Sequence, residues 1–166
     1  MKKIILCAVS IALILTGCSK EKAGNFELYL TDAPVQGLEN VYVTISGIYI
    51  KKGDEWSENI LNDPPLTLDL LTLRDREELI SGIELEAGTY VALKVVVSAA
   101  TVVYNGRTFT ITINPPAEVI IPVTFTIRGD ALTELVLDFD AEQSVRGGDQ
   151  EQFYILPVIV VKRIGY

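Results

Sequence analysis

From Phe26 onward the sequence is a succession of short segments in which apolar and polar residues alternate, separated by turn-forming residues. Such alternation is typical of β-strands with one buried face. Asn105-Gly106, between segments 101–104 and 107–113, predicts a two-residue hairpin, because a type I′ turn needs positive φ at both central positions. Roughly nine or ten short strands with hairpin connections predict an all-β fold, a single antiparallel β-sandwich.

Several segments allow more specific predictions. In the strand 41–52, Gly47 interrupts the alternation of apolar residues, which predicts a β-bulge. The valine-rich strand 89–98 is expected at the centre of a sheet. Pro115-Pro116 should end the strand that follows Gly106, and Arg128-Gly129-Asp130 should join strands 118–127 and 132–140 as a hairpin. Pro157 predicts an edge or a bulge in the last strand, 152–164.

One short helix is expected. Thr72 followed by Asp75 resembles a capping box, and Gly82 closes the segment. The strand 66–71 should precede this helix, and a strand beginning at Ile83 should follow it.

The first residues read as a processed export signal. Lys2 and Lys3 precede the uncharged stretch 4–15, which is too short for a membrane span of about 20 residues. Leu15-Thr16-Gly17-Cys18 then matches a lipobox, the site where a lipoprotein signal peptide is cut and the new N-terminal cysteine is lipidated. We therefore predict a signal peptide over residues 1–17, a lipidated tether over 18–25 and a β-sandwich domain over 26–166. An ordinary secretory signal with a chance cysteine is the alternative.

Lipidation at Cys18 places the domain in the cell envelope, because a diacylglyceryl group with a second acyl chain, such as palmitate, anchors a protein stably. Ser19 follows the cysteine, and it is not the aspartate that retains Gram-negative lipoproteins in the inner membrane. Outer-membrane placement, facing the periplasm or the cell surface, is therefore expected if the host is Gram-negative.

Charge and composition exclude several functions. The formal net charge is −8, and removal of Lys2 and Lys3 makes the mature chain more acidic, which argues against nucleic acid as a partner. The chain has no histidine, and Cys7 and Cys18 both lie in the signal and lipobox. These absences exclude Cys/His zinc sites and Ser-His or Cys-His nucleophiles, and they favour a protein that is not an enzyme.

Asp138-Phe139-Asp140, with Glu142 and Ser144 after it, is the cluster with the most chemistry. Residues two apart in a strand share a face, so Asp138 and Asp140 with Ser144 form a candidate calcium site, and no other cofactor is expected. The alternative is that Asp140 caps a turn and Asp138 is solvated or accepts backbone hydrogen bonds. Paired carboxylates also allow a glycosidase, although a domain this small offers little room for a sugar cleft.

Trp56, in a polar loop, with Tyr49 and Tyr42 on the preceding strand, is a candidate stacking platform for a sugar. The alternative is that Trp56 covers the end of the sandwich. The Arg128-Gly129-Asp130 tripeptide is explained by a turn, without an integrin-like partner.

Four motifs in order resemble the family known as domain of unknown function 4382. They are Leu30-Thr31-Asp32-Ala33-Pro34, Ala87-Gly88-Thr89-Tyr90, residues 138–145 and Leu156-Pro157. The resemblance implies an exported, often lipid-anchored domain with an immunoglobulin- or transthyretin-like sandwich related to carbohydrate-binding folds. It places Asp32 and Pro34 in a family-motif turn and transfers no catalytic residues.

The sequence thus favours a lipid-anchored, non-enzymatic binding module whose ligand is a glycan or an envelope protein. A structural or assembly subunit is the alternative, with residues 26–30 and the final strand as candidate edges for pairing. A carboxylate-based hydrolase is the minor alternative.

Overall fold

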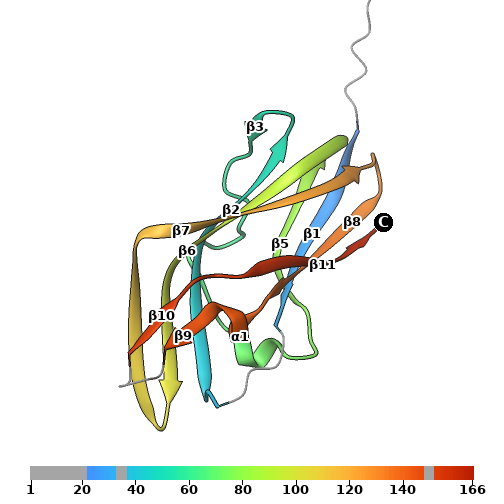
Figure 1. The fold of residues 1–166 in the computed structure, drawn as a ribbon. Helices are drawn as coiled ribbons and strands as arrows, with labels where there is room; N and C mark the ends of the chain where they lie inside the picture. Colours follow the sequence, from blue (N-terminus) through green and yellow to red (C-terminus); the bar gives the residue numbers. More distant parts are fainter. Residues whose placement is uncertain (1–21, 33–36, 148–151) are drawn as a thin grey trace, which may run out of the picture.

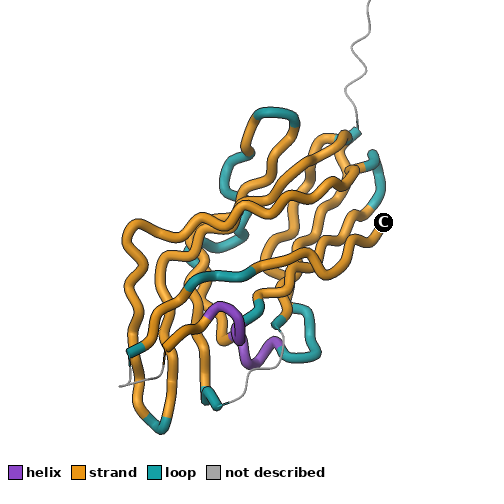
Figure 2. Tube along the Cα trace, in the orientation of Figure 1, coloured by secondary structure: helices purple, strands orange, loops and turns teal. Residues whose placement is uncertain are grey.

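Two β-sheets pack against each other around one apolar core (Figures 1 and 2). This computed structural model describes residues 22–32, 37–147 and 152–166. The prediction of an all-β sandwich with one short α-helix is confirmed, although one pair of strands is parallel.

The first sheet has four strands in the order β11-β8-β1-β5. The strands are β1 (Ala23–Thr31), β5 (Glu78–Glu86), β8 (Leu132–Phe139) and β11 (Ile159–Gly165). β1 pairs antiparallel with β5 and parallel with β8. The expectation that residues 26–30 form a sheet edge is therefore wrong, because both sides of β1 are paired. β11 is at the edge, as expected of the final strand.

The second sheet has five strands, in the order β3-β2-β6-β7 with β4 also paired to β2. The strands are β2 (Asn40–Lys52), β3 (Glu55–Trp56), β4 (Leu66–Asp69), β6 (Gly88–Tyr104) and β7 (Arg107–Ile127). β6 lies between β2 and β7, which confirms that the valine-rich segment is central.

The core forms where the apolar faces of the two sheets meet. In β2, Val41, Val43 and Ile45 are fully buried, and after the bulge Ile48 and Ile50 are buried instead. The register shifts around Ile45 and Gly47, so the predicted β-bulge is confirmed. Aromatic rings bridge the sheets: Phe125 stacks on Phe26 at 5.4 Å and on Tyr90 at 5.3 Å between ring centroids.

The β6–β7 hairpin turns at Asn105 and Gly106, as predicted. Their φ angles are 51° and 69°, and Tyr104 pairs with Arg107. Both central residues thus have the positive φ that the turn requires.

The predicted helix from Thr72 to Gly82 is wrong. A 3₁₀ helix covers only Leu70–Leu73, and Glu78–Glu86 is strand β5. The Thr72 hydroxyl donates to the carbonyl of Asp69 at 2.8 Å, so it does not cap a following helix. Asp75 has a φ of 57°, which is incompatible with helix continuation, and pairing with β1 then draws the rest of the segment into the sheet.

Pro115-Pro116 does not end a strand, because β7 continues to Ile127. Val97 of β6 pairs with Ala117 of β7, whereas Ala99 of β6 pairs with Thr112. The register therefore shifts between these two pairs. Residues 113–116 therefore have no pairing partner in β6. The two prolines lack backbone N–H groups, and this unpaired part of an edge strand accommodates them. β7 bends sharply along its length (Figure 1).

The predicted hairpin at Arg128-Gly129-Asp130 is also wrong, because β7 and β8 belong to different sheets. The turn carries the chain from one sheet to the other, with Asp130 at a φ of 61°. The Asp130 N–H donates to the carbonyl of Ala23 at 3.0 Å, and the Asn25 N–H to that of Ala131 at 2.9 Å. These bonds place Ala23 to Asn25 in β1, three residues before the expected strand start at Phe26.

After β8 the chain forms a short helix, α1 (Ala141–Ser144), then the small sheet of β9 (Val145–Gly147) and β10 (Phe153–Ile155). The expected last strand is divided at Pro157, which lies between β10 and β11. In place of the predicted edge or bulge within one strand, Pro157 lies in the break between two strands of different sheets.

Candidate functional site

A hollow of about 280 Å³ lies between the β2–β3 hairpin and the C-terminal part of β5. We call it the Trp56 hollow. Its lining combines aromatic, aliphatic, acidic and basic side chains: Ile50, Lys52, Glu55, Trp56, Ser57, Glu84, Leu85, Glu86 and Tyr90. Mixed apolar and polar lining of this kind is typical of sites for small polar molecules.

Trp56 and Tyr49 lie near each other, as the platform prediction required. Lys51 pairs with Trp56, and Tyr49 pairs with Lys94 of β6. The Lys94 ammonium lies 4.8 Å from the centroid of Tyr49 and 5.4 Å from that of Trp56, and Lys51 lies 5.9 Å from that of Trp56. Tyr42 is farther along β2, opposite Thr101, and does not take part.

One aromatic wall of the hollow is held by a lysine. Lys52 donates to Glu86 at 3.3 Å and to the carbonyl of Ala87 at 3.1 Å, and its ammonium lies 5.7 Å from the centroid of Tyr90. The Tyr90 hydroxyl donates to the carbonyl of Glu86 at 3.0 Å. Burial raises the pKa of Tyr90, so the hydroxyl stays protonated at neutral pH.

Gly88 is required at the turn beside this wall. Its φ is 143°, and a Cβ there would lie 2.8 Å from Cε of Lys52. The absence of a side chain therefore lets Lys52 cross the turn and reach Glu86. This gives a structural reason for the Ala87-Gly88-Thr89-Tyr90 segment.

Two carboxylates of the hollow have no bonding partner among the described residues. Within the ranges that the structure describes, the side chains of Glu55 and Glu84 make no hydrogen bond or ion pair, and both are exposed. Carboxylate oxygens accept hydrogen bonds from hydroxyl groups, and aromatic rings stack on the apolar face of a sugar. Both kinds of side chain that contact sugar rings therefore line the hollow.

The proposed calcium residues lie at the end of β8, where each has other contacts. Asp140 caps α1: its carboxylate accepts from the backbone N–H of Gln143 at 2.7 Å and from its side-chain amide at 2.5 Å. The Ser144 hydroxyl donates to the carbonyl of Asp140 at 2.5 Å and accepts from the Val158 N–H at 2.9 Å. The alternative that Asp140 caps a turn is thus what the structure shows, while calcium binding stays a prediction.

Asp138 is half-buried, and its Oδ1 has no hydrogen-bond partner among the described residues. Burial raises the pKa of its carboxyl. The negative charge of Asp140 raises this pKa further, and the positive charge of Lys162 lowers it. Among the described residues, no three His, Cys, Asp or Glu side chains surround a common position that could hold a metal ion.

Asp32 connects two of the distinctive sequence motifs. It is 5% exposed, and its Oδ1 accepts from the backbone N–H of Ala141 at 2.9 Å. It thus ties the end of β1 to the start of α1, and its role is structural. Pro34 and Cys18 lie outside the described residues, and no helix within those residues is long and apolar enough to cross a membrane.

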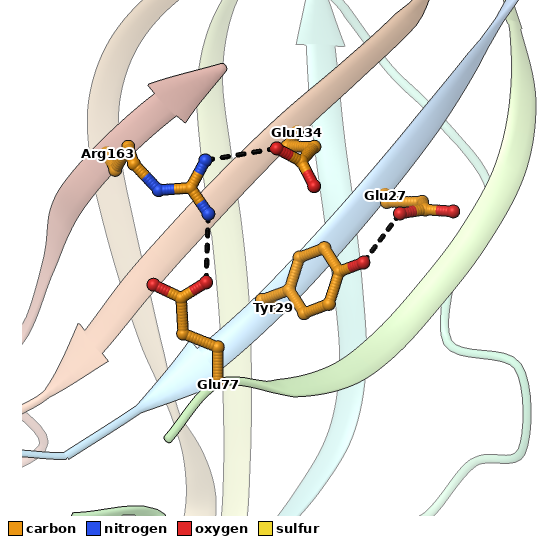
Figure 3. Close-up of polar contacts among 5 residues, drawn as sticks. All are labelled: Glu27, Tyr29, Glu77, Glu134 and Arg163. Atoms are coloured by element: carbon orange, nitrogen blue, oxygen red, sulfur yellow. Dashed lines mark hydrogen bonds and ion pairs between the residues drawn. The ribbon is translucent and has the colours of Figure 1, made fainter. Parts of the chain in front are cut away.

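A polar network on the outer face of the first sheet was missed from the sequence (Figure 3). Arg163 of β11 binds Glu134 at 3.0 Å and Glu77 at 2.8 Å, and the Tyr29 hydroxyl donates to Glu27 at 2.6 Å. The hydrogen bond to Glu27 is the main reason that the pKa of Tyr29 is raised to about 12. The network joins residues from distant parts of the chain. The alternation of polar and apolar residues in β1 indicates only that Glu27 and Tyr29 share the outer face.

Comparisons with known proteins identify a family and no function. A family model described as "Domain of unknown function (DUF4382)" matches residues 23–157, most of the chain. Neither the search of curated proteins nor the search of solved structures returned a match.

Proposed function

Since the chain belongs to the DUF4382 family, a domain of unknown function, we propose its function from the geometry of the Trp56 hollow: a lipid-anchored, non-enzymatic module of the cell envelope that binds a glycan. The observation that carries the proposal is the combination of Trp56 and Tyr90 with the uncommitted carboxylates of Glu55 and Glu84 in one hollow.

A glycan fits this combination better than a wholly apolar ligand does. Sugar hydroxyls donate to carboxylates, and the indole ring stacks on sugar C–H groups. The Lys52 ammonium already donates hydrogen bonds to Glu86 and to the carbonyl of Ala87. Its role is therefore to hold this side of the hollow in place, and other side chains bind the sugar hydroxyls. The residues of the hollow show no nucleophile–base pair, which supports binding without turnover.

The direct test is a glycan array probed with the full chain purified in detergent. For a glycan that binds, Trp56→Ala should weaken affinity about tenfold, or about 1.4 kcal/mol. Tyr154→Ala, on β10 and outside the hollow, is the matched control and should bind as the parent does. Equal affinity of the Trp56→Ala variant, or no glycan binding at all, would contradict the proposal, and Trp56-dependent binding of an envelope protein would identify a protein ligand in its place.

An assembly subunit is a second candidate, favoured by the free edge at β11. This strand pairs only with β8 among the described strands, and Val160 is 50% exposed on it. An unpaired strand edge is a template for pairing with another chain. A carboxylate-based hydrolase stays the minor alternative, and specific turnover of a glycan that is abolished by Asp138→Asn would establish it.

A further inference from the structure

The Trp56 hollow lies at the same end of the sandwich as the start of β1. Ala23, the first residue of β1, pairs with Glu86, which lines the hollow. The β3 hairpin and the beginning of β1 lie together at the upper end of the view, whereas β9 and β10 lie toward the opposite end (Figure 1). The chain therefore enters the domain beside the hollow.

The chain between the lipobox cysteine and this end is short. Four residues lie between Cys18 and Ala23, so the chain takes five steps from one to the other. A fully extended chain covers at most about 3.6 Å per step, or about 18 Å in all. A lipid on Cys18 thus holds Ala23, and the hollow that adjoins it, close to the bilayer surface.

Side chains at this end have the chemistry of a membrane interface. Lys22, Lys51 and Lys52 accompany Trp56, and the Arg128 guanidinium lies 5.1 Å from the ring centroid of Tyr166. Trp, Tyr and Lys have an apolar body and a polar tip, which is why they are favoured at the level of lipid headgroups.

We propose that the Trp56 hollow faces the membrane that carries the anchor, and that its ligand is the sugar headgroup of a glycolipid in that membrane. This inference rests on the proposed function and names the source of the glycan. A phosphate headgroup is disfavoured, because Glu55 and Glu84 lie in the hollow without basic partners among the described residues, and the whole chain is acidic with a net charge of −8.

Trp56 is the only tryptophan of the chain, so its fluorescence reports the position of the hollow directly. The lipidated full-length protein is reconstituted into phosphatidylcholine vesicles with a nitroxide quencher on a fraction of the headgroups. We expect strong quenching of Trp56. A Trp56→Phe/Tyr154→Trp variant is the matched control, because residue 154 is 53% exposed on β10 at the far end, and it should be quenched several-fold less.

The second arm identifies the ligand. Vesicles in which part of the phosphatidylcholine is replaced by a galactosyl diacylglycerol should shift the Trp56 emission to shorter wavelength, and Glu84→Gln should reduce that shift at least twofold. An equal amount of phosphatidylglycerol tests a phosphate headgroup and should leave the emission unchanged.

The outcomes separate the two proposals. Equal quenching of the two tryptophan positions, or a shift with phosphatidylglycerol and none with the glycolipid, would overturn this inference. Glycan-array binding through Trp56 would still support the proposed function in that case. Mass spectrometry that finds no lipid on Cys18 would overturn the anchor and this inference together.

Discussion

At the residue scale, aspartates that resemble metal ligands in the sequence accept hydrogen bonds from backbone N–H groups. Asp140 accepts the N–H of Gln143 and Asp32 accepts the N–H of Ala141, so both aspartates bind backbone N–H groups of α1. Ser144 continues the same arrangement by binding the Val158 N–H. These contacts give Asp32, Asp140 and Ser144 a structural role around α1.

Replacing Asp32 tests its structural role. Asp32→Ala leaves the buried N–H of Ala141 without its acceptor, which should lower the free energy of unfolding by about 1–3 kcal/mol. Urea unfolding followed by circular dichroism measures the change. Asp63→Ala, at an exposed position, should change stability little, and equal effects of the two variants would refute the role assigned to Asp32.

Asp138 gives a pH-dependent prediction. Burial raises the folded-state pKa of this carboxyl above its unfolded value, so its ionisation costs stability once the pH rises through the folded pKa. Asp138→Asn should therefore raise the melting temperature at pH 7. The gain should disappear as the pH falls below about 4, the ordinary aspartate range, where both states of the parent are protonated. Melting curves at a series of pH values check this, and a gain that is constant with pH would contradict it.

At the element scale, the turn from β5 to β6 requires its glycine, whereas a glycine inside β5 could be replaced. Gly88, the first residue of β6, has a φ of 143° and lies against Lys52, while a Cβ on Gly82 of β5 would meet nothing within 4 Å. Gly82 does not need a positive φ, so its lack of a side chain is no backbone requirement.

These two glycines make a matched pair of variants. Gly88→Ala should destabilise the protein by more than about 1 kcal/mol and weaken glycan binding, because Lys52 must move away from Glu86. Gly82→Ala should be neutral or stabilising by up to about 1 kcal/mol. Thermal unfolding compares them, and a Gly88→Ala protein as stable as Gly82→Ala would show that the turn tolerates a side chain.

At the scale of the whole molecule, β11 and β5 form the two edges of the first sheet among the described strands, while β1 is paired on both sides. If the protein assembles through β11, Val160→Lys should convert oligomers to monomers, since an edge lysine opposes strand pairing. Light scattering after size-exclusion chromatography of the detergent-solubilised chain measures this. A parent protein that is monomeric at every concentration would remove the assembly hypothesis.

The calcium hypothesis is tested through the stability of the whole molecule. If Asp138, Asp140 and Ser144 bind the ion, the parent should melt at a higher temperature in millimolar calcium than in chelator, and Asp140→Asn should lose that difference. Identical melting curves of the parent in the two conditions would remove the calcium site.

Local patterns in the sequence predict most of the strands, the Gly47 bulge and the Asn105-Gly106 hairpin, because each depends on alternation or on the φ angles of adjacent residues. It also paired Trp56 with Tyr49 as neighbours. The tertiary structure alone decided that Glu78–Glu86 is a strand, since pairing with β1 outweighs a local capping signal.

Only the tertiary structure decided the remaining features as well. The parallel pairing of β1 with β8 joins segments about a hundred residues apart, and the turn at Arg128–Asp130 passes between the sheets. The Trp56 hollow likewise exists because β5 and the β2–β3 hairpin come from opposite sheets. Such placements follow from the burial of two apolar faces against each other, a condition on the whole chain that no local pattern contains.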